Sequence, residues 1–170
     1  MLKRIAIVGP ESTGKSVLSE KLATYFKTAW VPEYARQYLD QIDRPYEEND
    51  LLEIAKGQLK LEDDHAKTAH DFLICDTNLL VVKIWSEVKY GHCHPWIINQ
   101  IKNRHYYHHL LTSIDLPWEF DPYREHPDMR EFLFDKYKFE LDQLGCSYTI
   151  IKGDYQERLD LAIAALKALK

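Results

Sequence analysis

The stretch GPESTGKS, from Gly9 to Ser16, directly follows the apolar run RIAIV. It matches the pattern G-x-x-x-x-G-K-[ST], in which two glycines bracket a polar loop that ends in a lysine and a hydroxyl residue. Glycine lets the backbone turn tightly enough for successive N–H groups to face phosphate oxygens, and the helix that follows adds the positive end of its dipole. The stretch therefore predicts a strand, a polyphosphate-binding loop and a helix in direct succession.

The side chains of this loop have distinct expected roles. Lys15 is expected to reach the β- and γ-phosphates of a nucleoside triphosphate, and the Ser16 hydroxyl is expected to ligate Mg²⁺. Pro10 has no N–H, and its place next to the strand predicts no phosphate contact. The residues predicted to bind the ATP phosphates are Gly9, Glu11, Ser12, Thr13, Gly14, Lys15, Ser16 and Val17.

Outward from this loop, short runs rich in β-formers alternate with amphipathic helical patterns. Such alternation is typical of βαβ units, whose strands form a parallel sheet with helices on both faces. We therefore predict an α/β fold with three layers around a central five-stranded parallel sheet. The strands are expected at residues 4–8, 29–31, 72–75, 108–114 and 147–151.

Helices are expected between these strands, because apolar residues recur there every three or four positions. The recurring residues begin at Leu18, Leu51 and Leu79, and the third of these helices is expected to end at Gly91. Gly91 is suited to this place because a glycine readily takes the left-handed conformation that closes many helices.

Two later helices are expected to begin with capping boxes, in which an acidic residue and a glutamate three positions on satisfy the first N–H groups. One box is Asp128 with Glu131, and the other is Asp154 with Glu157. The helix that follows Asp128 is expected to carry Leu144 on its apolar face.

Length and composition indicate one domain over residues 1–170, long enough to bury about 70% of its unfolded surface. The residues are 45% apolar and 29% charged, with a net charge of −5, which disfavours both disorder and a nucleic-acid surface. No apolar run approaches the roughly 18 residues that a membrane span requires. We expect a cytoplasmic protein that binds a small molecule, with no nucleic acid and no membrane insertion; its oligomeric state stays open.

Polar residues follow the second and third predicted strands, where a parallel sheet places its ligands. Glu33, Tyr34 and Arg36 lie in VPEYAR. A carboxylate there could take the proton of an attacking hydroxyl, and the arginine could hold a polar substrate, with a surface salt bridge as the alternative. Asp76 ends the apolar run FLICD, in the place of the acidic residue that supports Mg²⁺ in phosphate-loop enzymes.

Residues 115–130 contain three prolines and mixed charges, so neither a strand nor a regular helix is expected through them. Long structured loops in compact domains are often lids. Arg124 and Arg130 are candidates to close over the charge of a transferring phosphoryl group. Trp118 is the preferred flat wall for an aromatic base and Trp85 is a second candidate, with ordinary core packing as the alternative.

Several stretches together resemble the ribosylnicotinamide kinase domain of NadR-type proteins. These are GPESTGKS, VPEYAR, CDTN followed by IWSEVKYG, DLPWEFDPYRE and KGDYQERL, which span residues 9–159. The phosphate loop is shared by a very large superfamily, whereas the spaced combination of the others is more particular. The resemblance implies a P-loop kinase fold and transfer of the ATP γ-phosphate, with Mg²⁺, to the ribose 5′-hydroxyl of nicotinamide riboside.

Candidate roles follow from the residues and the resemblance together. Ser16 and Asp76 would hold Mg²⁺, Glu33 would be the general base, and Gly153 and Asp154 would border the adenine. The catalytic residues would be Lys15, Glu33, Arg124 and Arg130. The residues that contact the substrate would be Glu33, Tyr34, Arg36, Asp76, Trp85, Trp118 and Asp121.

Two departures from the family pattern bear on these expectations. Asn78 stands where the family usually has a second aspartate, which removes a carboxylate that could contact the metal or the ribose. The adenylyltransferase and DNA-binding modules that often accompany the family do not fit in this length, so we expect a free-standing kinase. Two alternatives stay open: a kinase for another nucleoside, a nucleotide or a vitamin alcohol, and an NTP-dependent switch without an acceptor.

Overall fold

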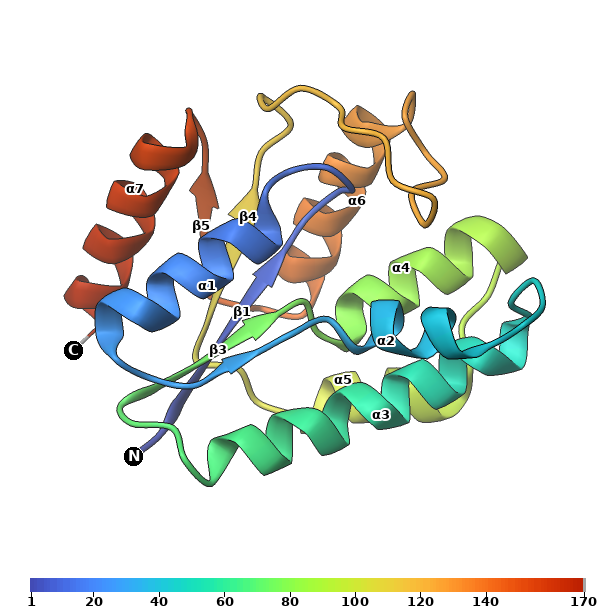
Figure 1. Cartoon of the computed structure of the whole chain (residues 1–170), viewed down its shortest axis with the longest axis horizontal. Coiled ribbons are helices and arrows are strands. Elements are labelled where there is room, and N and C mark those ends of the chain that lie inside the picture. The colour runs from blue at the N-terminus through green and yellow to red at the C-terminus, as the bar shows by residue number, and fades with distance from the viewer. Residues whose placement is uncertain (170) are drawn as a thin grey trace.

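A five-stranded parallel sheet forms the centre of the computed structural model, which describes residues 1–169 (Figure 1). The strands lie in the order β2-β3-β1-β4-β5, and every neighbouring pair is parallel. The five predicted strands are confirmed, each within two residues at either end, and so is the predicted α/β class. Their bounds are β1 Lys3–Val8, β2 Trp30–Val31, β3 Phe72–Asp76, β4 His108–Thr112 and β5 Tyr148–Ile151.

The order of the strands decides where a ligand can bind. The chain visits β2 and β3 on one side of β1, and then crosses to β4 and β5 on the other side. In open α/β sheets, the carboxyl ends of the strands form a ligand-binding crevice where the strand order reverses in this way. The GPESTGKS loop leaves β1 at this crevice.

Helices cover both faces of the sheet (Figure 1). Within residues 1–169 they are α1 Lys15–Phe26, α2 Tyr34–Gln41, α3 Glu48–Ala66, α4 Leu79–Tyr90, α5 Pro95–Asn103, α6 Arg130–Gln143 and α7 Tyr155–Ala168. Ile5 and Ile7 of β1 pack against α1 and α7, whereas Ala6 and Val8 pack against α4 and α6 on the opposite face. All four side chains are fully buried, as expected for a central parallel strand. α2, α3 and α5 pack with α4 in a further apolar cluster.

The predicted helices all exist, but one start was predicted at the wrong residue. Asp154 and Glu157 form the capping box of α7, as predicted. Asp128 does not cap α6, because Met129 is the N-cap residue and no side chain caps this helix in the described part of the chain. Met129 is still outside helical geometry, with φ −109° and ψ 9°. The carboxylate of Asp128 therefore lies one residue too early to reach the N–H groups of the first turn.

α2 and α5 are absent from the sequence prediction, although α5 has a recognisable start. The His94 side chain accepts the Trp96 N–H, and Pro95 occupies the first helical position, which suits proline. Leu144 was predicted on the buried face of α6 and instead is 38% exposed. It lies beyond the last residue of the helix, where the chain turns through Gly145 with φ 64°.

Residues 113–129, which we call the lid segment, form neither helix nor strand, as the prolines predict. Figure 1 shows this segment in orange above the loop that follows β1, at the end of the molecule away from both termini. The lid segment therefore covers the crevice identified by the strand order. Within residues 1–169, no helix has the length and apolar character needed to cross a membrane.

Candidate active site

The loop after β1 is fixed tightly against β4. Gly9 has φ 145°, and a Cβ atom there would lie 2.4 Å from Thr112 Oγ1 and 2.8 Å from Thr112 O. The Thr13 hydroxyl contacts both Pro10 O and Thr112 Oγ1 at 2.7 Å. Because only glycine avoids the overlap at the strand exit, the first glycine of the motif is required by the approach of β4.

Lys15 opens α1 and lies over the same loop. Its ammonium group donates to Gly9 O at 3.0 Å and to Pro10 O at 2.7 Å. Burial lowers the pKa of Lys15, while the Glu33 and Asp76 carboxylates oppose this shift. No described side chain caps α1, so the positive end of the helix dipole is available to an anion.

Ser16 and Asp76 form the part of the site that fits a divalent cation. Ser16 Oγ donates to Asp76 Oδ2 at 2.5 Å, whereas the buried Asp76 Oδ1 has no hydrogen-bond partner. Burial and the nearby Glu33 carboxylate raise the pKa of Asp76 to about 7. A hydroxyl beside an unpartnered carboxylate oxygen is a donor set that suits Mg²⁺ in phosphate-loop proteins. The two residues predicted to hold the metal thus lie together.

Replacing Asp76 by asparagine is expected to weaken the contribution of Mg²⁺ to binding of a non-hydrolysable nucleoside triphosphate. The substitution keeps the shape of the side chain but removes the charge that attracts the cation. We expect the gain in affinity on adding Mg²⁺ to fall by about 10- to 100-fold, as measured by calorimetry with and without the metal. Asp128→Asn, on the exposed lid surface, is the control. An unchanged Mg²⁺ effect would remove Asp76 from the metal site.

Glu33 and Arg36 line the same cavity as the phosphate loop. Arg36 pairs with Asp121 at 3.0 Å and lies 5.5 Å from the centre of the Tyr123 ring. Burial raises the pKa of Glu33, against the opposing effects of Lys15 and Arg36. A carboxylate with a raised pKa beside basic groups has the properties of a general base.

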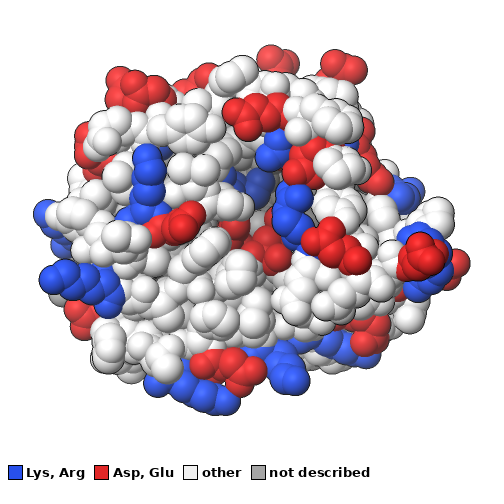
Figure 2. Space-filling model, in the orientation of Figure 1, with Lys and Arg blue, Asp and Glu red and all other residues white. Residues whose placement is uncertain are grey.

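The cavity has a volume of about 210 Å³. Figure 2 shows a hollow on this face of the molecule whose floor carries basic and acidic side chains next to each other. The apolar part of the cavity wall comes from α2, α4 and α6. Its residues include Leu39, Val81, Ile84, Trp85, Val88 and Leu133.

The three predicted aromatic contacts are placed differently. Trp85 lines the cavity, and its Nε1 donates to Tyr46 Oη at 2.9 Å. Tyr34 does not line it, because its ring packs where a side chain on Gly57 would lie. Trp118 also lies outside the cavity lining, 5.8 Å from the Arg130 guanidinium. Of the three, Trp85 is in position to contact a ring-bearing ligand.

The lid segment is bound to side chains of the phosphate loop. The Glu11 carboxylate accepts the N–H of His126 at 2.9 Å and that of Glu125 at 3.2 Å. Ser12 Oγ accepts the Glu119 N–H at 2.8 Å. Glu11 and Ser12 occupy variable positions of the motif, and their side chains hold the lid segment over the phosphate loop.

The two arginines predicted to act from the lid differ in position. Arg124 lines the cavity, and its Nη1 donates to Glu119 O at 2.5 Å and to Ser12 Oγ at 3.3 Å. Arg130, at the start of α6, donates to Ser12 O at 3.1 Å and to Leu116 O at 2.9 Å, and it does not line the cavity. Arg124 is thus the one placed to reach a ligand, and Arg130 joins the lid to the loop.

Asn78 is separated from the Ser16–Asp76 pair by a turn. Thr77 has φ 71°, an uncommon value for a β-branched residue. Asp76 lies on the phosphate-loop side of this turn, whereas the Asn78 side chain accepts the Leu80 N–H at 3.0 Å and caps α4. Asn78 in place of the family's second aspartate therefore does not remove the Asp76 carboxylate beside Ser16.

Gly153 and Asp154 lie in the turn between β5 and α7 and do not line the cavity, whereas the next residue, Tyr155, does. The Gly153 N–H donates to Asp115 Oδ2 at 2.5 Å, and Asp154 caps α7. The turn predicted to border the adenine is thus joined to the first residues of the lid segment.

Sequence reasoning missed Arg158, which connects three parts of the site. Its side chain is 2% exposed and pairs with Asp115. The guanidinium also donates to Thr13 O and Gly153 O at 2.7 Å and to Ser113 O at 3.0 Å. The sequence did contain a signal for its burial. Arg158 stands four residues before Ala162 and eight before Leu166, and therefore lies on the helix face that α7 buries.

A family model described as an AAA domain matches residues 4–158. The chain belongs to this family. Curated relatives include the trifunctional NAD biosynthesis/regulator protein NadR of Escherichia coli (strain K12), 30% identical over 129 residues, which are 72% of this chain and 31% of NadR. NadR of Salmonella typhimurium (strain LT2) matches to the same extent. The chain spans about a third of the length of these relatives.

Solved structures share the fold of this AAA domain. NadR in complex with NR superposes with a TM-score of 0.82 at 18% identity, over 98% of this chain and 50% of that chain. Deoxyadenosine kinase from M. mycoides, with products bound, superposes with a TM-score of 0.68 at 16% identity, over 97% of this chain and 99% of that chain. Thymidylate kinase from Ehrlichia chaffeensis gives 0.67 at 14% identity, over 99% of both chains. The predicted P-loop kinase fold is confirmed.

Proposed function

We propose that this protein transfers the γ-phosphate of ATP to the ribose 5′-hydroxyl of nicotinamide riboside, giving nicotinamide mononucleotide. The observation that carries the proposal is a single cavity that joins the phosphate loop to Glu33, Arg36 and an apolar wall with Trp85. The relatives support the reaction class, since NadR is described as a NAD biosynthesis protein and one NadR structure contains NR. We further propose that residues 1–170 act as one kinase domain.

In the proposed reaction the substrate supplies the nucleophile. The 5′-hydroxyl oxygen bonds to the γ-phosphorus while the bond from that phosphorus to the β–γ bridging oxygen breaks, so ADP leaves and Glu33 takes the hydroxyl proton. Lys15 and the N-terminus of α1 stabilise charge on the phosphate oxygens, and Arg124 adds to this from the lid. Ser16 and Asp76 would hold Mg²⁺, which when bound supplies further neutralisation of the triphosphate.

Charges at the acceptor end favour a nucleoside over a nucleotide. Arg36 is the one basic residue among the described cavity-lining residues that belongs neither to the phosphate loop nor to the lid. It is already paired with Asp121. A monophosphate would bring a charge of about −2 next to Glu33 and this pair, whereas ribose hydroxyls can donate to the same carboxylates.

The apolar end of the cavity favours a ring with positive charge. Trp85 on α4 lines the cavity, and aromatic faces attract cations, whereas the Tyr123 ring already has the Arg36 guanidinium 5.5 Å from its centre. The neighbouring α4 residues Val81, Ile84 and Val88 bring no positive charge that would repel such a ring. The pyridinium ring of nicotinamide riboside has the charge that this combination accommodates.

The proposal is tested by incubating the protein with ATP, Mg²⁺ and, separately, nicotinamide riboside, cytidine or deoxyadenosine, with the nucleotide products separated by chromatography. We expect nicotinamide riboside to have the highest kcat/KM. Lys15→Ala should lower product formation by at least about 100-fold while keeping the far-ultraviolet circular dichroism of the parent, because it removes a charge at the transferred phosphate.

Two results would contradict parts of this proposal. Faster turnover of cytidine or deoxyadenosine would exclude nicotinamide riboside as the preferred substrate, but it would still support a nucleoside kinase. Slow ATP hydrolysis that no nucleoside accelerates would favour a nucleotide-dependent switch, for which the acceptor-end residues Glu33 and Arg36 have no evident use.

A further inference from the structure

Trp85 is held from behind by a tyrosine that lies outside the cavity. The Tyr46 ring, in the connection between α2 and α3, meets the Trp85 ring edge to face, with the ring centres 4.9 Å apart and the planes at 66°. Trp85 Nε1 donates to Tyr46 Oη at 2.9 Å. Trp85 lines the cavity of the phosphate loop, and Tyr46 does not. Tyr46 can therefore act on a ligand in the cavity through Trp85 but not by direct contact.

The hydroxyl proton of Tyr46 is directed at the lid segment. An indole N–H can only donate, and a carboxylate can only accept. Because Tyr46 Oη accepts from Trp85, its own proton is left for Glu125, whose Oε1 and Oε2 atoms lie at 2.9 and 2.8 Å. Burial, together with this bond to Glu125, raises the pKa of Tyr46, so the hydroxyl keeps its proton at neutral pH. The two bonds thus run in one direction, from Trp85 through Tyr46 to the lid.

Lys89 of α4 packs against both members of the second bond. Its ammonium group lies 3.6 Å from the centre of the Tyr46 ring and 3.4 Å from Glu125 Oε1. Lys89 therefore balances the charge of Glu125 and makes a cation–π contact with the tyrosine at the same time. We call Tyr46, Trp85, Lys89 and Glu125 the Tyr46 cluster. It joins the α2–α3 connection, α4 and the lid segment.

Glu125 connects the Tyr46 cluster to the phosphate loop. Its main-chain N–H donates to Glu11 at 3.2 Å, while its side chain accepts from Tyr46. One lid residue is therefore bonded to the loop that would hold the triphosphate and, through Tyr46, to the aromatic wall that would face the acceptor ring. If the lid moved away from the loop, Tyr46 would lose the carboxylate that orients its hydroxyl for the Trp85 N–H.

We propose that Tyr46 is a positioning residue that holds Trp85 in the orientation that receives the ring of the acceptor nucleoside, and that Glu125 makes this orientation depend on a closed lid. The inference deepens the proposed kinase function and rests on it for the identity of the acceptor. The wall for the acceptor ring would be complete only when the lid covers the phosphate loop. The acceptor would then be held in place when water is excluded from the transfer site.

The first test is the steady-state kinetics of Tyr46→Phe, which keeps the ring and removes the hydroxyl. We expect the KM for nicotinamide riboside to rise by about three- to tenfold, the effect of one lost hydrogen bond, with kcat and the KM for ATP within about twofold of the parent. An unchanged KM for nicotinamide riboside would overturn the positioning role.

The double variant tests whether Glu125 acts through Tyr46. Glu125→Ala should raise the same KM, although it keeps the main-chain bond to Glu11. Combined with Tyr46→Phe, it should give a KM no higher than that of the more affected single variant, because both substitutions interrupt one chain of bonds. Additive effects would overturn the link between the lid and Trp85.

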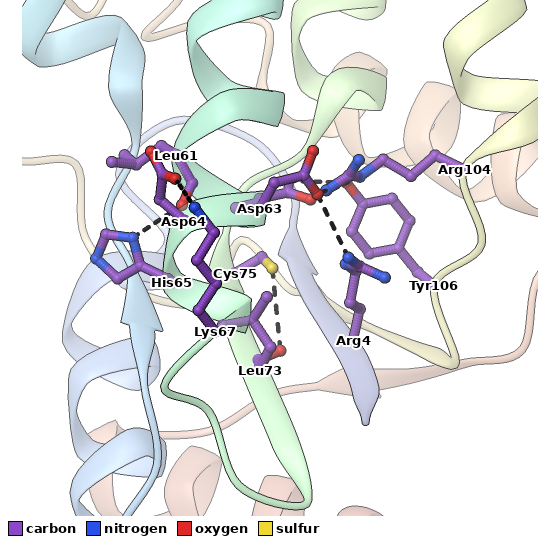
Figure 3. Close-up of polar contacts among 11 residues, drawn as sticks. Arg4, Leu61, Asp63, Asp64, His65, Lys67, Leu73, Cys75, Arg104 and Tyr106 are labelled. Carbon is purple, nitrogen blue, oxygen red and sulfur yellow. Dashed lines mark hydrogen bonds and ion pairs between the residues drawn. The ribbon is translucent and has the colours of Figure 1, made fainter. Parts of the chain in front are cut away.

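Tyr106→Phe is the matched control, because Tyr106 also donates its hydroxyl to a glutamate. Its acceptor is Glu62, at 2.8 and 2.9 Å, which Arg104 also contacts. Figure 3 shows Tyr106 beside Arg104 and Arg4, near the amino ends of β1 and β4 and thus at the edge of the sheet opposite the phosphate loop. This variant should lower the Tm without changing the KM for nicotinamide riboside. An equal change of KM in both tyrosine variants would indicate a general loss of stability and would overturn the proposal.

A second readout does not depend on the acceptor. The protein has four tryptophans, whose indole N–H signals can be followed by NMR in ¹⁵N-labelled protein, with that of Trp85 assigned by its loss in Trp85→Phe. Tyr46→Phe and Glu125→Ala should both shift the Trp85 signal, because the bond from its N–H is lost in the first and weakened in the second. Asp128→Ala, at an exposed lid position, should not shift it.

The NMR result separates this inference from the identity of the acceptor. A Trp85 signal that does not respond to Glu125→Ala would overturn the proposal, whichever nucleoside is phosphorylated. If the expected shifts occur while another nucleoside is phosphorylated fastest, the positioning role of Tyr46 is supported and the proposed acceptor alone is wrong.

Discussion

Glutamine in place of Glu33 is expected to lower kcat for phosphoryl transfer by about 10²- to 10⁴-fold, the usual range for loss of a general base. Glutamine keeps the size and hydrogen-bonding reach of the side chain but cannot take the hydroxyl proton. The KM for ATP should stay within about twofold, because the phosphate contacts come from the loop and Lys15 and not from Glu33. Initial rates over a matrix of ATP and nucleoside concentrations separate the two effects.

The dependence of the transfer rate on pH is a second test of Glu33 as the general base. Burial raises the pKa of Glu33, and the pKa of the neighbouring Asp76 is raised to about 7. The parent rate should therefore fall as the pH drops through this region, because the protonated carboxyls can neither accept the proton nor bind Mg²⁺. Glu119→Gln, on the lid wall of the same cavity, should behave like the parent. A Glu33→Gln variant with full kcat would exclude Glu33 as the base.

Several features that depend on local chemistry were predicted from the sequence, although the equally local capping box at Asp128 was wrong. The loop from Gly9 to Ser16 was identified because its glycines are required by backbone geometry, and the structure shows this at Gly9, where Thr112 leaves no room for a Cβ atom. The position of Asp76 followed from a general rule, that ligands lie beyond the carboxyl ends of parallel strands. The capping box at Asp154 was likewise readable from four adjacent residues.

Features that depend on contacts distant in sequence were not predicted. The Glu11 bonds to the lid join residues 114 and 115 positions apart, and the motif treats that position as variable. Trp118 was preferred over Trp85 because it lies on the lid, yet the lid turns it toward Arg130 and outside the cavity. Spacing along the chain cannot reveal which face of an irregular loop meets the ligand, because no periodicity orders its side chains.

Alanine in place of Arg158 is expected to be the most destabilising single substitution at this site. It removes the donors for Thr13 O, Gly153 O and Ser113 O and leaves Asp115 without its cationic partner. The Asp115 side chain is 40% exposed, so most of the loss comes from the three carbonyls left without donors, about 3–5 kcal/mol of the free energy of unfolding in total. For a chain of this size, that corresponds to a fall in Tm of roughly 6–20 °C, which thermal denaturation followed by circular dichroism would measure.

A lysine at position 158 separates the structural effect from an effect on the site. Lysine keeps the charge for Asp115, but its single ammonium group cannot span carbonyls on the phosphate loop, the β5–α7 turn and the end of β4 at once. At a temperature where Arg158→Lys remains folded, we expect KM for ATP to rise more than kcat falls, because the Thr13 carbonyl belongs to the loop that binds the triphosphate. Equal stability and equal KM in the alanine and parent proteins would show that the loop holds its shape without this arginine.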